Sequence, residues 1–223
     1  MLSNSRKSGQ SGFTLVEIAI VLVIIGLLLG GIIKGQEMIT QAKIKNVIND
    51  FNGLTAAIAS YQDRYRAVPG DDRSSAARWS VTGNGNGDGQ FDLAAGAGVT
   101  PELYNNTAGV NTAEVSLFWR DMRLSGFVPG ATTGAASLTP PNNAVSGLVG
   151  VQTTGMGFTS NIVCTSNLPD KIAIAVDTQM DDQSPATGQL RGMVQAGPNP
   201  ATGAASTSYF ETGTNQYLVC KNL

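Results

Sequence analysis

Residues 13–33 read FTLVEIAIVLVIIGLLLGGII, and this stretch decides how the chain is organised. It carries one charged residue, Glu17, and has the length that a helix needs to cross the hydrocarbon core of a bilayer. Arg6 and Lys7 precede it, and no acidic residue occurs before Glu17. The positive-inside rule therefore places the N-terminus in the cytoplasm and the larger part of the chain outside.

A cleaved secretory signal is the alternative interpretation, because such a signal also has a basic start and an apolar run. Two features favour a retained anchor instead. The apolar run is longer than a typical signal core, and no small-x-small cleavage site follows it. The polar residues Lys34, Gln36 and Glu37 continue a helical pattern beyond the run.

The start of the apolar run has a specific pattern. Ser11-Gly12-Phe13-Thr14-Leu15-Val16-Glu17, followed by apolar residues to Ile33, resembles the N-terminus of the type IV pilin superfamily, which includes pilins, type II secretion pseudopilins and competence pilins. The resemblance implies cleavage between Gly12 and Phe13 by prepilin peptidase, N-methylation of Phe13 and assembly into a filament. It is close over residues 7 to about 35, although the helix-bending prolines of the best-known pilins are missing.

Glu17 is a carboxylate inside an apolar helix, which is costly to insert into a membrane and is therefore usually paired and functional. The resemblance implies that its partner is the N-terminal amine of Phe13 on a neighbouring subunit. The alternative is that Glu17 reaches back to the cytoplasmic interface, since it lies near the start of the run. We expect the pairing in assembly.

One long helix is predicted over residues 13–66, with residues 13–33 as the transmembrane segment and filament core. From Ile44 to Tyr65 apolar residues recur at three- and four-residue steps, and no proline occurs before Pro69. The second half of the helix should therefore lay one apolar stripe on its own domain. The sequence also places four glycines in the membrane half, which favour either close helix packing or local unwinding: Gly26, Gly30, Gly31 and Gly35.

The remaining chain is expected to give an α+β fold, in which the long helix packs on a C-terminal antiparallel sheet, as the resemblance also implies. Residues 1–12 form the cleaved leader, and residues 67–145 form a connecting region with short amphipathic helices at 72–80 and 112–125. Residues 146–223 hold the sheet and a disulfide-bounded region. Strand-like runs, which predict four or five strands, occur at 147–152, 171–176, 190–196, 209–212 and 216–220.

Cys164 and Cys220 are the only cysteines. The outward topology places them in an oxidising compartment, so a disulfide is expected and two free thiols are the alternative. The resemblance implies the same pairing, since many pilins carry a C-terminal disulfide loop.

A Gly/Asn/Asp stretch at residues 83–92 resembles the first half of a calcium loop. Counted from Asn84, oxygen-bearing side chains stand at positions one, three, five and nine, and Gly89 stands at position six. These side chains are Asn84, Asn86, Asp88 and Asp92. Ala95 occupies the twelfth position, where a bidentate Glu belongs, so Asp71 or Asp72 would have to complete the site. A Gly/Asn turn without metal is slightly favoured, and no cofactor is required.

The composition excludes several kinds of site. The chain has no histidine, which removes Ser-His-Asp triads and imidazole ligands. Its 14 basic and 16 acidic residues give a net charge of -2 and no footprint for nucleic acid. The acidic group Asp177, Asp181 and Asp182 is interpreted as solvated turn charge. We expect no enzymatic activity.

The expected function is that of a structural subunit of a type IV pilus-like extracellular filament. The expected partners are other copies of the chain, the prepilin peptidase and methyltransferase, and the assembly machinery of the bacterial inner membrane, where the precursor is stored. A minor pilin or a type II secretion pseudopilin is the first alternative. A monomeric membrane-anchored module that binds calcium or another ligand is the second. The sequence leaves open whether DNA or a host surface is bound.

Overall fold

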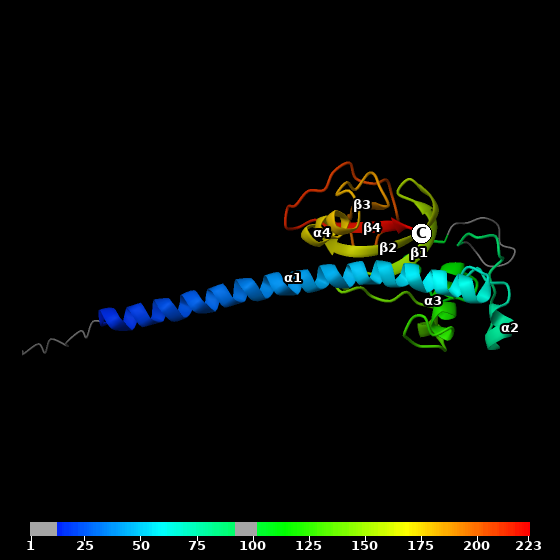
Figure 1. Cartoon of the computed structure of the whole chain (residues 1–223), viewed down its shortest axis with the longest axis horizontal. Coiled ribbons are helices and arrows are strands. Elements are labelled where there is room, and N and C mark those ends of the chain that lie inside the picture. Colours follow the sequence, from blue (N-terminus) through cyan, green and yellow to red (C-terminus); the bar gives the residue numbers. More distant parts are fainter. Residues whose placement is uncertain (1–12, 92–101) are drawn as a thin grey trace, which may run out of the picture. The chain divides into compact units, whose positions relative to one another are not determined.

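The computed structural model describes residues 13–91 and 102–223. Gly12, the rest of the leader and Asp92 lie outside these residues. The chain divides into two compact units, Met1–Gln41 and Ala42–Leu223. We call the second unit the head. One helix, α1 (Leu15–Tyr65), contributes residues to both units (Figure 1).

In the first unit, α1 is long and apolar enough to cross a membrane. Its most apolar window has a mean hydropathy of 2.9, and none of that window is buried. All four glycines of this segment lie within the helix, and a Cβ atom added at any of them would meet nothing within 4 Å. The prediction of an apolar N-terminal helix is confirmed.

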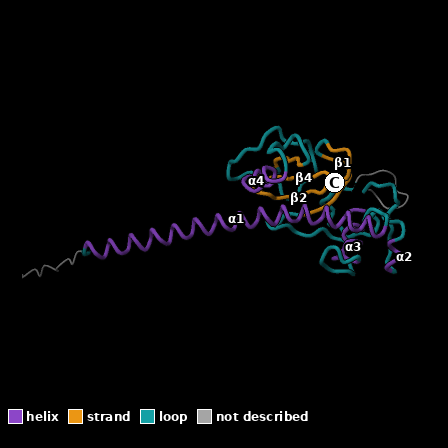
Figure 2. Tube along the Cα trace, in the orientation of Figure 1, coloured by secondary structure: helices purple, strands orange, loops and turns teal. Residues whose placement is uncertain are grey.

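Within its described residues, the head contains three further α-helices and one sheet. After α1 come α2 (Ser75–Trp79), α3 (Glu114–Leu124) and a 3-10 turn, η1 (Ala135–Ser137). They are followed by β1 (Val149–Gly155), β2 (Phe158–Pro169), α4 (Asp170–Met180), β3 (Leu190–Val194) and β4 (Gln216–Asn222). The four strands form one antiparallel sheet in the order β1-β2-β4-β3, drawn in orange in Figure 2. The α+β prediction is confirmed.

The head buries apolar residues on both faces of the sheet, because successive strand residues point to opposite faces. One face packs against the predicted stripe of α1 and against α3. This cluster includes Val47, Phe51, Leu54 and Tyr61 of α1, Phe118 and Trp119 of α3, and Val151, Val163 and Val219 of the sheet. The opposite face holds a smaller cluster with Tyr104, Ile162, Leu218 and the two cysteines. The amphipathic half of α1 therefore forms part of the core of the head.

Two of the strand predictions are wrong. Residues 171–176 lie in α4, where Ile172, Ala173 and Val176 are buried at helical spacing. Residues 209–212 form no strand, because side-chain acceptors take their donors in place of a ladder. The Phe210 N–H donates to the Tyr217 hydroxyl at 2.8 Å, and the Thr212 N–H donates to Asp170 Oδ2 at 2.7 Å. The longest strand, β2, was not predicted, whereas the runs at 147–152, 190–196 and 216–220 are confirmed.

Candidate functional site

Glu17 lies in the first turn of α1 and closes a reciprocal cap with Thr14. Its Oε2 accepts hydrogen bonds from the Thr14 N–H at 2.7 Å and from Thr14 Oγ1 at 2.8 Å, while the Glu17 N–H donates to Thr14 Oγ1 at 3.3 Å. This arrangement is a capping box, which satisfies donors that a helix N-terminus leaves free. Within the described residues Oε1 accepts no hydrogen bond, so this oxygen is available to a second donor.

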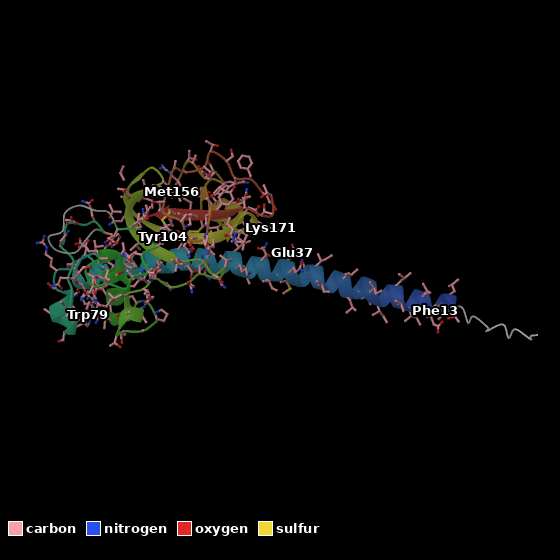
Figure 3. The ribbon with its side chains drawn as sticks, turned by 180° about the vertical axis from the view of Figure 1, so that it is seen from behind. Phe13, Glu37, Trp79, Tyr104, Met156 and Lys171 are labelled. Atoms are coloured by element: carbon pink, nitrogen blue, oxygen red, sulfur yellow. A yellow bond between two sulfur atoms is a disulfide. The ribbon has the colours of Figure 1, made fainter. Side chains whose placement is uncertain are left out.

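The first unit presents its apolar side chains outward. Phe13 is 85% exposed, and residues 15–33 carry large apolar side chains on every side of the helix (Figure 3). An exposed apolar surface of this extent requires lipid or other apolar helices around it. The N-terminal unit is therefore built for a membrane or for packing among similar helices.

The Gly/Asn/Asp loop brings together carboxylates from three parts of the chain. Oxygen atoms of Asp71, Asp88 and Glu114 lie within 4.8 Å of one another. Asp71 Oδ2 accepts the Gly89 N–H at 2.6 Å, and Glu114 Oε1 accepts the Asn86 N–H at 2.8 Å. The loop is thus held against the turn after α1 and against the start of α3.

The predicted ligands of the loop have different surroundings. Asp88 joins the three carboxylates, whereas Asn84 Oδ1 accepts the Ala76 N–H of α2 at 2.8 Å. Asn86 Oδ1 accepts the Asp88 N–H at 2.8 Å. The sequence also offered Asp72 as a residue that could complete the calcium site. Its carboxylate instead accepts the Tyr61 hydroxyl and pairs with Arg78.

Electrostatics at the loop favour a positive partner. Burial raises the pKa of Asp71, and the nearby Asp88 raises it further, although the N–H groups of Gly89 and Gly87 oppose the shift. Glu114 is fully buried. Carboxylates this close either hold a proton or share a cation, and a hard divalent ion such as calcium prefers oxygen ligands of this kind. Calcium binding stays a prediction.

Two buried polar networks beside the loop were not predicted. In the first, the Tyr61 hydroxyl donates to Asp72 Oδ2 at 2.9 Å, and Arg78 pairs with the same carboxylate. In the second, Arg120 Nη2 pairs with Asp121 Oδ1 at 2.8 Å, while Asp121 Oδ2 accepts the Gly70 N–H at 3.2 Å. Burial raises the pKa of Asp121 to about 6, against the opposing effect of Arg120. Both networks fix the turn between α1 and the rest of the head.

The acidic group Asp177, Asp181 and Asp182 lies at the C-terminal end of α4 and bonds within the turn there; the interpretation as solvated charge is wrong for Asp177, which is buried. Asp177 accepts the Gln183 N–H at 2.9 Å as well as the Tyr209 hydroxyl, and Asp181 Oδ2 accepts the Leu190 N–H at 2.7 Å. Asp182 Oδ2 accepts the Thr187 hydroxyl at 2.6 Å. Hydrogen bonds of this kind give these carboxylates a structural role in the turn.

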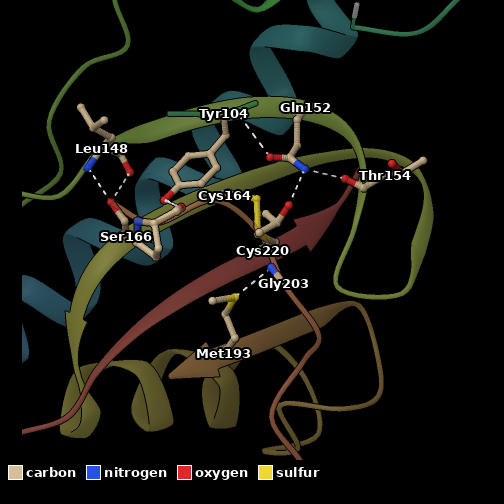
Figure 4. Close-up of a disulfide and its surroundings, with 11 residues drawn as sticks. Tyr104, Leu148, Gln152, Thr154, Cys164, Ser166, Met193, Gly203 and Cys220 are labelled. Atoms are coloured by element: carbon tan, nitrogen blue, oxygen red, sulfur yellow. Dashed lines mark hydrogen bonds between the residues drawn. A yellow bond between two sulfur atoms is a disulfide. The ribbon is translucent and has the colours of Figure 1, made fainter. Parts of the chain in front are cut away.

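Cys164 and Cys220 form a disulfide between β2 and β4 (Figure 4). The two residues stand directly opposite each other in the strand register, and both are fully buried. Tyr104 lies beside them and anchors the segment before α3, since its hydroxyl donates to the Pro200 carbonyl at 2.7 Å. The disulfide therefore lies inside the smaller core cluster.

Comparison with known proteins identifies the N-terminal segment. Residues 7–33 match the family model described as the prokaryotic N-terminal methylation motif. The motif, which is the class III signal of type IV pilins, indicates a type IV pilin-like or pseudopilin precursor. The long apolar helix and the antiparallel sheet give this precursor a pilin-like α+β fold. No curated protein and no solved structure matches the chain.

Proposed function

We propose that the chain is a structural subunit of a type IV pilus-like extracellular filament. The supporting observation is the methylation motif at residues 7–33, which includes the start of α1, where the apolar side chains of residues 15–33 are exposed in the single chain. The precursor waits in the inner membrane, prepilin peptidase cuts between Gly12 and Phe13, and the assembly machinery moves the mature subunit into the filament.

Assembly itself is the proposed mechanism. Apolar helices leave lipid and regain apolar contacts from sister helices. The Phe13 amine of one copy then approaches the free Oε1 of Glu17 on another, so that each charge gains a partner in an apolar surrounding. The head remains outside the bundle of helices, and we propose no catalytic activity for it.

A second candidate is a monomeric membrane-anchored module that binds calcium. The observation that favours it is the carboxylate group Asp71, Asp88 and Glu114. The two candidates differ in what they require of the N-terminus. An anchor tolerates a scrambled order of residues 13–17, whereas a filament subunit does not.

Mass spectrometry of surface filaments tests the proposal. Filaments sheared from cells should contain a subunit that begins at N-methylated Phe13. A Gly12→Arg variant is the control, because it should leave the full-length precursor in the membrane and yield no filaments. A chain found only as an uncut membrane monomer would contradict the proposal.

Within the class, the role of a minor pilin or pseudopilin is tested by whether deletion stops pilus formation or protein secretion.

A further inference from the structure

A groove of about 300 Å³ opens on the head between α1, α3 and the segments that lead into β1. Its walls are mostly apolar and include Leu54, Trp119, Phe127, Pro129, Pro141 and Val149. Asp50 of α1 is the only charged residue among the described residues that line it. One carboxylate therefore stands alone on an apolar surface.

Asp50 has no partner of its own. It is half-buried, and within the described parts of the chain it forms no hydrogen bond and no ion pair. Burial alone raises its pKa. The other half-buried or buried aspartates, such as Asp71 and Asp121, accept backbone N–H groups. A carboxylate withdrawn from water without a donor is unfavourable, and a cation supplied from outside would offset that cost.

We propose that this groove receives Lys45 of a second copy of the chain, whose ammonium group pairs with Asp50. This inference rests on the proposed filament. Lys45 is exposed on α1 and, within the described residues, forms no hydrogen bond or ion pair. A lysine suits an apolar groove that has one carboxylate in its lining, because its methylene stem packs against apolar walls while its charged end reaches a partner.

The spacing along α1 agrees with the pairing proposed at the N-terminus. Copies in a helical filament are related by one repeated operation, so all parts of a copy shift by the same distance along the axis. For parallel helices along that axis, Phe13 of one copy is level with Glu17 of the next after a shift of about 6 Å. The same direction of shift brings Lys45 level with Asp50 after about 7.5 Å. A lysine side chain spans the difference.

The two residues also lie on different sides of α1. Five residues at 3.6 residues per turn separate their directions by roughly 140°. A contact that joins two different surfaces of identical subunits is heterologous, and such contacts can extend without closing into a ring. The proposed pair is therefore a heterologous contact, as a contact within a filament must be.

Charge reversal in the full-length protein tests the pair. Asp50→Lys and Lys45→Asp should each lower the yield of sheared filaments at least about tenfold, because each places like charges together at an interface. The double variant should restore the yield to within about twofold of the wild type, since the pair is rebuilt with opposite polarity. The yield is measured relative to the membrane pool of the same variant.

Three controls make the test specific. Asp63→Lys changes an aspartate on the same helix that is 82% exposed, and it should leave the yield unchanged. Lys43→Asp combined with Asp50→Lys should not restore assembly, because Lys43 needs a shift of about 10.5 Å. A Cys164–Cys220 disulfide in the membrane pool, seen on non-reducing gels, reports a folded head.

Three outcomes would overturn the inference. These are normal yield from either single reversal, no recovery in the double variant while the head is folded, or equal recovery with Lys43→Asp. Absence of filaments from the wild-type chain would overturn the proposed function, and the inference with it, so the two failures are distinguishable.

Discussion

At the scale of single residues, Glu17 gives the sharpest prediction. Glu17→Ala should leave membrane insertion intact, because it removes the only charge from the apolar segment. Filaments should be absent, since the Phe13 amine of a neighbouring copy loses its acceptor. Membrane fractionation and shearing measure the two effects separately. Glu37→Ala is the matched control, because it alters a carboxylate of the same helix beyond the apolar run, and normal filament yield from Glu17→Ala would contradict the pairing.

The carboxylate group gives a second prediction. Calcium should raise the melting temperature of the detergent-solubilised chain, by a stabilisation of about 2.7 kcal/mol when its concentration is 100 times the dissociation constant. Asp88→Asn should abolish this rise, because Asp88 is the exposed member of the group. Asp182→Asn, in the other acidic group, should retain it. An unchanged melting temperature of the wild type in calcium removes the metal site.

The pH dependence of that stabilisation provides a third prediction. Burial raises the pKa of Asp71, so the folded head without calcium holds this proton more tightly than the unfolded chain does. Its stability therefore falls as pH rises through that pKa. Calcium needs the ionised carboxylate, and the difference between melting temperatures with and without calcium should grow with pH over the same range. A difference that is constant with pH would show that Asp71 is not a ligand.

The sequence identified part of this site. Asp88 stands in a recognisable spacing of oxygen-bearing residues. The disulfide could also be predicted, because the chain has two cysteines and the expected topology places both in an oxidising compartment. Glu114 could not be found in this way, because it belongs to a helix that is distant in sequence and meets the loop only after folding. Similarly, nothing in the local sequence distinguishes Asp50 from the other charged residues on α1.

At the scale of elements, sequence reasoning succeeded where periodicity is long. The stripe of α1 extends over many turns, and it predicts both the helix and its buried face. The run from Lys171 to Val176 is too short for its sequence to distinguish a strand from a helix. In the structure this run belongs to α4, which begins at Asp170 and packs its apolar residues on the sheet. In contrast, β2 mixes buried residues with Thr, Ser and Asn, so its strand character depends on pairing with β1 and β4.

Asp121 of α3 holds the turn that follows α1, because it accepts the Gly70 N–H and pairs with Arg120. This contact leads to a further prediction. Asp121→Ala should lower the free energy of unfolding by roughly 3–5 kcal/mol, because it leaves Arg120 buried without its counter-charge. Denaturant unfolding of the solubilised chain measures this loss. Asp63→Ala, at an exposed position of α1, should leave the unfolding midpoint unchanged. A loss below about 1 kcal/mol for Asp121→Ala would show that the network contributes little.

At the scale of the whole molecule, the disulfide should account for a large share of the stability of the head. Its cysteines are 56 residues apart, and the chain-entropy model assigns such a cross-link about 4 kcal/mol. The double variant Cys164→Ala and Cys220→Ala should therefore unfold at a lower denaturant concentration. The wild type in reducing agent under unfolding conditions should match it. Equal midpoints for the oxidised wild type and the variant would contradict this contribution.

The position of β4 has a mechanical consequence for a protein that is pulled. This last strand lies inside the sheet, between β2 and β3, and is bonded covalently to β2. Tension that enters through α1 and leaves through the C-terminus would cross from Cys164 to Cys220 without passing along residues 165–219. That part of the head, with α4 and β3, is therefore spared from stretching for as long as the covalent bond is intact.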